Sequence, residues 1–192
     1  WSSDVCSSDL KDGRIVDTVL GPEMRSTGEV MGYDRDFPTA FAKSQTAAYG
    51  NLPAKGTVFV SVSDQDKRAL ALPVSRLFDL GFSIMATAGT AALLRRYGIP
   101  VTEVRKASQG RGPDGEQTVV DMIRAGLIDM VINTPGTSGA RADGYEIRTA
   151  TTAADKPIIT TMSQFQAAVQ AIEATRDRTY GVCSLQEYDK AK

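Results

Sequence analysis

The chain has 192 residues, of which 42% are apolar and 23% charged, and its formal net charge is −1. This length suits one medium domain with an appendage, and the near-neutral charge gives no reason to expect nucleic acid or an anionic membrane as a partner. No apolar run approaches the roughly 20 residues of a membrane span, and no signal peptide is recognisable. We therefore expect a globular protein that works without nucleic acid and without a membrane.

The sequence contains no histidine. Serine and cysteine triads, histidine metal sites and histidine acid–base catalysis all lack their usual central residue. Binding is thus favoured over catalysis, and we assign no catalytic residue and no metal ligand. The two cysteines, Cys6 and Cys183, do not make a disulfide framework, which favours a reducing, cytoplasmic location.

Residues Trp1–Leu10 (WSSDVCSSDL) are serine-rich and do not match the rest of the chain. They resemble translated sequencing-adapter sequence, so we treat residues 1–10 as a non-native or disordered segment. Residues 11–55 are expected to be an appendage and a linker. Within them, Phe37–Tyr49 is predicted to be a helix, because Asp36 is a good N-cap, proline follows early and Gly50 is a stop. We place the domain boundary at Asn51–Gly56, so that 56–192 forms the main domain.

From Thr57 onward, short apolar runs alternate with helical patterns. Strands are predicted at Thr57–Val62, Ser83–Ala86, Val101–Val104, Ile128–Ile132 and Pro157–Thr160. Helices are predicted at Asp64–Leu80, with a kink or restart at Pro73, and at Thr90–Tyr97, Gln117–Ala125, Asp143–Ala154 and Ser163–Ala174. This alternation predicts an α/β fold, a parallel sheet covered by helices on both faces in three layers. Ligands of such sheets sit beyond the carboxyl ends of the strands.

Thr87-Ala-Gly-Thr90 is predicted to be a tight turn from a strand into a helix N-terminus. Free backbone N–H groups and the positive end of the helix dipole converge there, which favours an anion. Gly89 would let the backbone approach a phosphate, although the same residues would also serve a simple turn and cap.

Other polar residues fall in loops that follow predicted strands, and so at the same edge of the sheet. They provide two lysines, an amide and several hydroxyls, a set that suits a phosphate monoester. The candidate phosphate- and effector-binding residues are Lys67, Thr87, Gly89, Thr90, Lys106, Asn133, Thr134, Thr137 and Ser138.

Several motifs resemble the carboxyl end of the large chain of carbamoyl phosphate synthetase. They are LGPEMRSTGEVMG (Leu20–Gly32), FPTAFAKSQ (Phe37–Gln45), SVSDQDK, ATAGT, VRK and INTPGTSG. The resemblance covers essentially Asp17 to the C-terminus, and GPEMRSTGEVMG is its most telling part. In that family this motif closes the second ATP-grasp synthetase unit, and the segment from about Gly56 is a methylglyoxal-synthase-like regulatory domain.

The resemblance implies a domain that binds nucleotide effectors such as UMP or IMP and tunes carbamoyl phosphate synthesis for pyrimidines and arginine. It places the phosphate contacts on Lys67, Thr87, Thr90 and Lys106, and further contacts on Asn133 and the loop after it. Thr160 matches a position near the family's ornithine activator site. The loops at Gly112–Gln117 and Asn133–Gly139 differ from some relatives, so the identity of the nucleotide stays open.

The resemblance also implies partners and cofactors. The partners would be the remainder of the large chain and the glutaminase small chain, and a homo-oligomer stays open. ATP with Mg or Mn would belong to the full enzyme, and no cofactor is expected in this chain, which should be inactive alone because it lacks the ATP-grasp body. We also expect residues 11–50 to pack poorly here, with Val30, Met31, Phe37 and Phe41 exposed.

Two alternatives stay open. A small methylglyoxal-synthase-type lyase would share the fold and the phosphate threonines, and Glu116 lies near the expected base, but the histidine of that family is missing. A domain that serves only oligomerisation is the other alternative.

Overall fold

The computed structural model of the chain describes residues 30–113, 115–136, 141–177, 181 and 187. Residues Met31–Lys192 form one compact unit. The expectations for residues 1–10 and for most of the GPEMRSTGEVMG motif lie outside the described residues. None of the described helices is long and apolar enough to cross a membrane.

The unit is built on a five-stranded parallel sheet with the order β3-β2-β1-β4-β5. The strands are β1 (Thr57–Ser61), β2 (Ser83–Ala86), β3 (Thr102–Glu103), β4 (Met130–Asn133) and β5 (Ile158–Ile159). β1 is central and is buried on both faces, as its continuous apolar run predicts. The predicted α/β fold is therefore confirmed.

Helices precede, connect and follow the strands. They are α1 (Phe37–Tyr49), η2 (Asp64–Asp66), α2 (Lys67–Asp79), α3 (Ala88–Arg96), η3 (Ala107–Gln109), α4 (Val119–Arg124), α5 (Arg141–Ala153) and α6 (Met162–Thr175). Asp36 caps α1 as predicted, because its carboxylate accepts a hydrogen bond from the Thr39 N–H. Pro73 lies inside α2 and is buried, so this helix runs through the proline and does not restart there.

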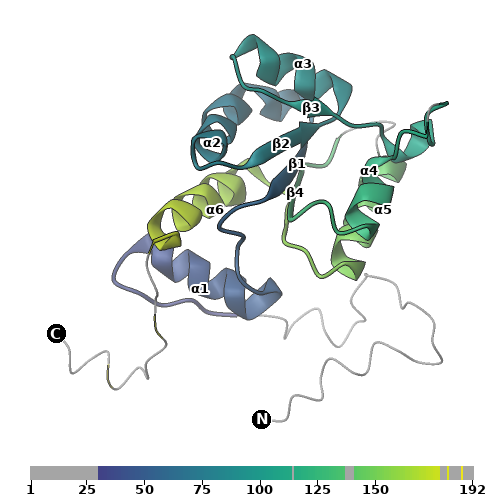
Figure 1. Ribbon diagram of the computed structural model, residues 1–192. Helices are drawn as coiled ribbons and strands as arrows, with labels where there is room; N and C mark the ends of the chain where they lie inside the picture. Colours follow the sequence, from purple (N-terminus) through teal and green to yellow (C-terminus); the bar gives the residue numbers. More distant parts are fainter. Residues whose placement is uncertain (1–29, 114, 137–140, 178–180, 182–186, 188–192) are drawn as a thin grey trace, which may run out of the picture. The chain divides into compact units, whose positions relative to one another are not determined.

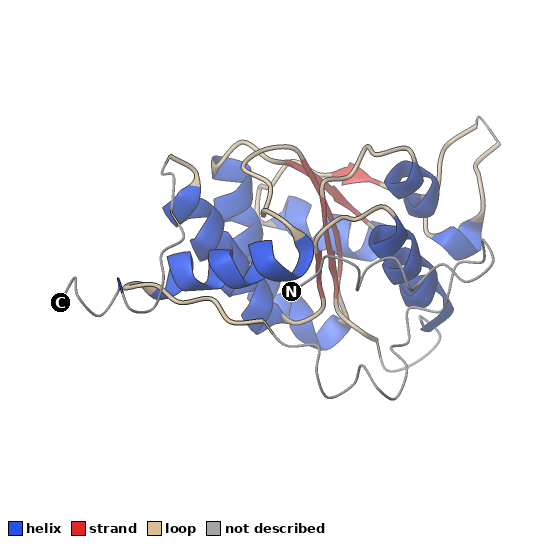
Figure 2. Cartoon of the chain, turned by 90° about the horizontal axis from the view of Figure 1, so that it is seen from below, coloured by secondary structure: helices blue, strands red, loops and turns tan. Residues whose placement is uncertain are grey.

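The helices cover both faces of the sheet, so the unit has three layers (Figures 1 and 2). α2, α3 and α6 pack on one face, around residues such as Val58, Ile84 and Phe165. α4 and α5 pack on the other face, around residues such as Phe59, Val131 and Ile147. Val58 and Phe59 are neighbours in β1 that face opposite cores, which is the alternation a strand imposes.

The strand order creates a switch point at the centre of the sheet. From β1 the chain builds outward through β2 and β3, and it then returns to add β4 on the other side of β1. The connection after β1 leads to α2 on one face, and the connection after β4 leads to α5 on the opposite face. The two connections diverge, which leaves a crevice at the carboxyl ends of these strands.

The packing of α1 differs from the expectation that residues 11–50 pack poorly. α1 lies along α6, and its Ala42 is only 3% exposed (Figure 1). Phe41 packs against the core that α2, α3 and α6 enclose, although Met31 and Phe37 are exposed as expected. One apolar stripe of α1 therefore belongs to this unit.

Candidate functional site

A cavity of about 640 Å³ lies at the carboxyl ends of β1, β2 and β4. Its wall comes from the η2–α2 start, the first turn of α3, the loop that carries Lys106, the loop after β4 and the amino-terminal half of α5. Its charged side chains are Lys67, Lys106, Arg148, Asp64 and Asp143. Three cations against two carboxylates make the cavity suitable for an anion.

The first turn of α3 forms one end of the cavity. α3 begins at Ala88, so the residues predicted to make a tight turn are already helical, with Thr87 in the extended N-cap position. The Ala91 N–H bonds to the Thr87 carbonyl at 2.8 Å, whereas the N–H groups of the preceding first turn have no carbonyl inside the helix to bond. Thr90 is only 2% exposed yet lines the cavity, and its hydroxyl has no partner among the described residues. These groups together favour an anion.

Lys67 reaches over this helix end from the start of α2. A Cβ added at Gly89 would lie 3.5 Å from Lys67 Nζ, so the ammonium sits directly above the glycine of the first turn. Lys67 Nζ also contacts Asp64 Oδ1 at 2.6 Å, and this partner lowers the pKa of the Asp64 carboxyl. The Asp64 side chain is 93% exposed, so the pair is open to exchange with another anion.

The β4 end of the cavity is built from a hydrogen-bonded chain. Asn133 Nδ2 donates to the Ser61 carbonyl at 3.3 Å, and Arg148 Nη1 donates to Asn133 Oδ1 at 3.0 Å. Thr134 is also fixed, because its hydroxyl accepts from the Ser63 N–H at 2.9 Å. These bonds tie the connection after β1 to the connection after β4 and to α5.

Lys106 enters the cavity from the short helix η3 and its flanking loop. The Lys106 N–H donates to Gln109 Oε1 at 2.9 Å. Asp143 at the start of α5 accepts from the Ser108 N–H at 2.8 Å and from the Ser108 hydroxyl at 3.0 Å. These two hydrogen bonds between Ser108 and Asp143 join η3 to α5 and so help to position the adjacent Lys106.

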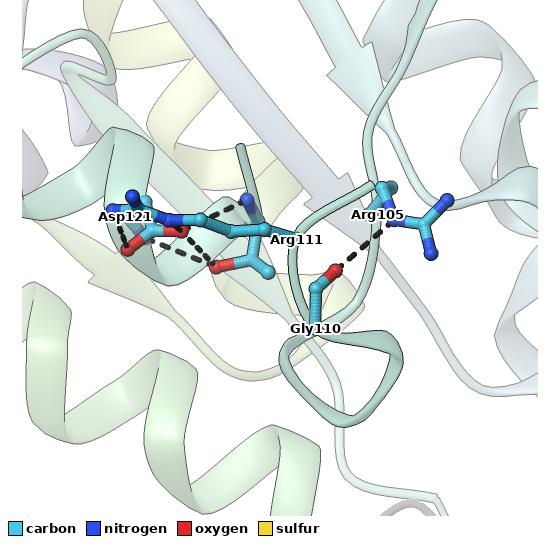
Figure 3. A network of polar contacts seen from close by, with 5 residues as sticks. Arg105, Gly110, Arg111 and Asp121 are labelled. Atoms are coloured by element: carbon cyan, nitrogen blue, oxygen red, sulfur yellow. Dashed lines mark hydrogen bonds and ion pairs between the residues drawn. The ribbon is translucent and has the colours of Figure 1, made fainter. Parts of the chain in front are cut away.

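Two arginines brace the rest of this loop (Figure 3). Arg105 donates to the Gly110 carbonyl at 3.1 Å and to Glu116, and Arg111 donates to both oxygens of Asp121 at 3.2 Å. Asp121 also caps α4 together with Thr118, and these hydrogen bonds, led by the one from Arg111, lower the pKa of Asp121 to about 2. The loop is thus held at both ends by carboxylates.

Seven of the nine candidate effector-binding residues line this one cavity. They are Lys67, Thr87, Gly89, Thr90, Lys106, Asn133 and Thr134. The other two, Thr137 and Ser138, lie outside the described residues. Thr160, which follows β5, does not line the cavity, and its N–H donates to Gln164 Oε1 at 3.4 Å.

The sequence reasoning missed the contribution of α5. Asp143, Gly144, Ile147 and Arg148 all line the cavity. Their spacing of one, four and five residues places them on one side of a helix that follows β4, and this was the signal available in the sequence. Among the described residues, no group of three or more acidic, cysteine or histidine side chains is arranged to hold a metal ion.

Glu116, the base of the alternative lyase, does not line the cavity. It contacts Arg105 Nη1 at 3.3 Å and lies against Gly112, in a separate pocket beside β3. The geometry therefore does not favour proton abstraction from a ligand held on Thr90 and Lys67.

Comparison with known families shows which family the chain belongs to. The sequence profile of the MGS-like domain matches residues 69–176, which is more than half of the chain. The chain belongs to the MGS-like domain family. The match runs from α2 to the end of α6, so it includes most of the cavity wall.

Curated relatives of this MGS-like domain protein are named carbamoyl phosphate synthase large chain. The Beutenbergia cavernae protein is 70% identical over 180 residues, which is 94% of this chain and 16% of that protein. Those of Kineococcus radiotolerans and Mycobacterium tuberculosis are each 62% identical over 92% of this chain and 16% of their own length. The chain thus spans about a sixth of these relatives. A solved structure of ForH aligns over 63% of this chain and 80% of its own, with a TM-score of 0.45 at 22% sequence identity.

Proposed function

We propose that this MGS-like domain is the carboxyl-terminal regulatory part of a carbamoyl phosphate synthase large chain, and that it binds a nucleoside monophosphate effector such as UMP or IMP. The similarity to the curated large chains supports the first part. The second part rests on one observation, the placement of Lys67 Nζ over Gly89 at the amino end of α3. A cation, free N–H groups and a buried hydroxyl converge there on one point.

The phosphate would dock at this point. Thr87 and Thr90 offer hydroxyls, and Lys67 and Lys106 offer charge from two different elements, the start of α2 and the loop before η3. Charge-assisted hydrogen bonds contribute about 1.5–3 kcal/mol each, and three or four of them suffice for micromolar affinity, about −8 kcal/mol, after the costs of association. The base and ribose would extend towards Asn133 and the loop after it.

In this proposal the chain regulates and does not catalyse. The complete enzyme, a ligase of the cytoplasm, would make carbamoyl phosphate from bicarbonate, ATP and glutamine-derived ammonia for pyrimidine and arginine synthesis. ATP, its metal and the glutaminase small chain would be bound by the remainder of the large chain. The ornithine activator is proposed to act near Thr160, away from the cavity.

The phosphate site predicts the effect of two substitutions. Lys106→Ala and Thr90→Ala should each weaken the binding of UMP or IMP about tenfold to a hundredfold, because each removes a donor to the phosphate, worth about 1–3 kcal/mol. Calorimetric titration of the full chain with each nucleotide measures this.

Lys55→Ala is the matched control, because Lys55 is exposed and lies before β1, at the opposite edge of the sheet from the cavity. The Lys55→Ala variant should bind UMP and IMP with the same affinity as the parent. If the parent binds neither nucleotide at millimolar concentration, or both cavity variants bind as tightly as the parent, the phosphate site is assigned wrongly.

A further inference from the structure

Arg148 stands at the end of the cavity remote from the proposed phosphate site. It is half-buried, and Nη1 donates to Asn133 Oδ1 at 3.0 Å. Within the described residues no carboxylate pairs with it. A guanidinium has five N–H donors and no acceptor, so most of its donors and its charge remain available at this end of the cavity. These donors suit a ligand that supplies oxygen acceptors.

The partner of Arg148 is locked in one orientation. Asn133 is only 5% exposed, and its amide nitrogen donates to the Ser61 carbonyl while its amide oxygen accepts from Arg148. Turning the amide over would break both bonds at once. Gly144 lies directly against this pair, since a Cβ there would come within 3.0 Å of Arg148 Nη1 and 3.4 Å of Asn133 Oδ1. The guanidinium is therefore held in place from two sides.

The separation of the two ends suits a nucleotide. Thr87 follows β2 and Asn133 ends β4, with β1 between them. Neighbouring strands lie about 4.8 Å apart, so the two ends are roughly 10 Å apart across the sheet. A ligand whose phosphate sits at α3 would then bring the edge of its base, and not a second part of its phosphate, to Arg148.

We infer that Arg148, oriented by Asn133, is a specificity-determining residue that selects bases with a carbonyl oxygen at the distal exocyclic position. This inference rests on the proposed nucleotide site. Uracil and hypoxanthine present an oxygen at that position, whereas cytosine and adenine present an amino group. A guanidinium facing an amino group leaves donors unpaired on both sides, and a buried unpaired donor is costly.

Matched nucleotide pairs test this assignment. UMP and CMP differ at this exocyclic group and the protonation of the adjacent ring nitrogen, as do IMP and AMP. Calorimetric titration of the full chain should give UMP at least about tenfold tighter than CMP, and IMP at least about tenfold tighter than AMP. Arg148→Met keeps an unbranched, largely apolar stem and removes every donor, so in this variant both affinity ratios should fall to about one or two.

Arg96→Met is the control, because it removes the same charge from an exposed position in the last turn of α3, and it should keep both ratios. If Arg148→Met melts at a lower temperature than the parent, Arg148→Lys serves as a second variant that keeps the charge. It should still reduce both affinity ratios, because an ammonium lacks the planar set of donors with which a guanidinium can bond Asn133 and the base together. Equal binding of UMP and CMP by the parent, or ratios unchanged in both variants, would overturn the role of Arg148 while the phosphate site stands. Binding of none of the four nucleotides would instead overturn the proposed function itself.

Discussion

At the scale of single residues, Lys67 has a competing partner. Its ammonium sits over the first turn of α3 and contacts the exposed carboxylate of Asp64 at 2.6 Å. Lys67 lowers the pKa of Asp64, so this carboxylate stays ionised at neutral pH. A phosphate that docks on α3 would therefore share Lys67 with Asp64, whose negative charge opposes that of the phosphate.

Removing this competitor should improve binding. In Asp64→Asn we expect UMP to bind roughly two- to fivefold more tightly, because the exposed ion pair with Lys67 is weak and its loss removes a negative charge beside the phosphate. Asp79→Asn, at the exposed far end of α2, is the charge-matched control and should bind like the parent. Unchanged or weaker binding by Asp64→Asn, measured by titration, would show that the pair does not compete with the ligand.

The sequence allowed residues at the ends of strands and just after them to be predicted, but not those farther along a helix. Lys67 and Asn133 could be placed in one cavity because the carboxyl ends of parallel strands share an edge of the sheet. Arg148 lies fifteen residues after Asn133, in α5, and its place depends on how α5 packs on β4. That packing is a tertiary property, which a pattern of single residues does not specify.

At the scale of elements, the strands and helices follow the predicted order, and the differences lie at their ends. α3 begins at Ala88, two residues before the prediction, because Thr87 already adopts the extended N-cap conformation. Pro73 is tolerated within α2 and is buried against the core, an environment that the sequence pattern did not reveal. Local signals thus predicted the existence of each described strand and α-helix better than its limits, and they did not reveal the short helix η3.

The Arg111–Asp121 ion pair joins the loop after Lys106 to α4, and it predicts that the stability of the fold depends on pH. Asp121 has its pKa lowered from 3.8 to about 2, chiefly by Arg111. A carboxyl whose pKa is lower in the folded state stabilises it above its unfolded pKa, and this contribution is lost as the pH falls from about 4 to 2. We therefore expect the melting temperature of the parent to exceed that of Asp121→Asn near pH 6, and the difference to shrink steadily below pH 4.

Melting curves of both proteins between pH 6 and pH 2.5 measure this difference. Asp79→Asn controls for the general loss of one carboxylate, since its position is exposed and outside the loop. A difference between parent and Asp121→Asn that stays constant down to pH 2.5 would contradict the role of the Arg111–Asp121 pair.

At the scale of the whole molecule, α1 contributes to the stability of the unit. Ala42 and Phe41 pack towards α6 and the core beneath it, so removing α1 would expose the outer side of α6. A chain that starts at residue 51 should melt several degrees below one that starts at residue 30, because about 1 kcal/mol moves a domain of this size by several degrees. This reverses the expectation from sequence alone, which assigned residues 11–50 to a missing neighbour.

Thermal melting of the two truncated chains tests this contribution, with Ala42→Glu in the longer chain as a point substitution that disrupts the same contact. Equal melting temperatures of the two chains would mean that α1 only rests on the surface of α6.

The strand order also has a consequence for synthesis on the ribosome. Val58 of the central strand pairs with Met130, 72 residues later, and Ile132 of the same late strand pairs with Ile159. A nascent chain that ends before β4 therefore carries β1 with one edge unpaired, and contacts this distant in sequence form slowly. The cavity requires β1, β2, β4 and α5 together, so it forms only after most of the described chain has emerged. A nascent chain that has not yet reached α5 therefore lacks the site proposed for the effector.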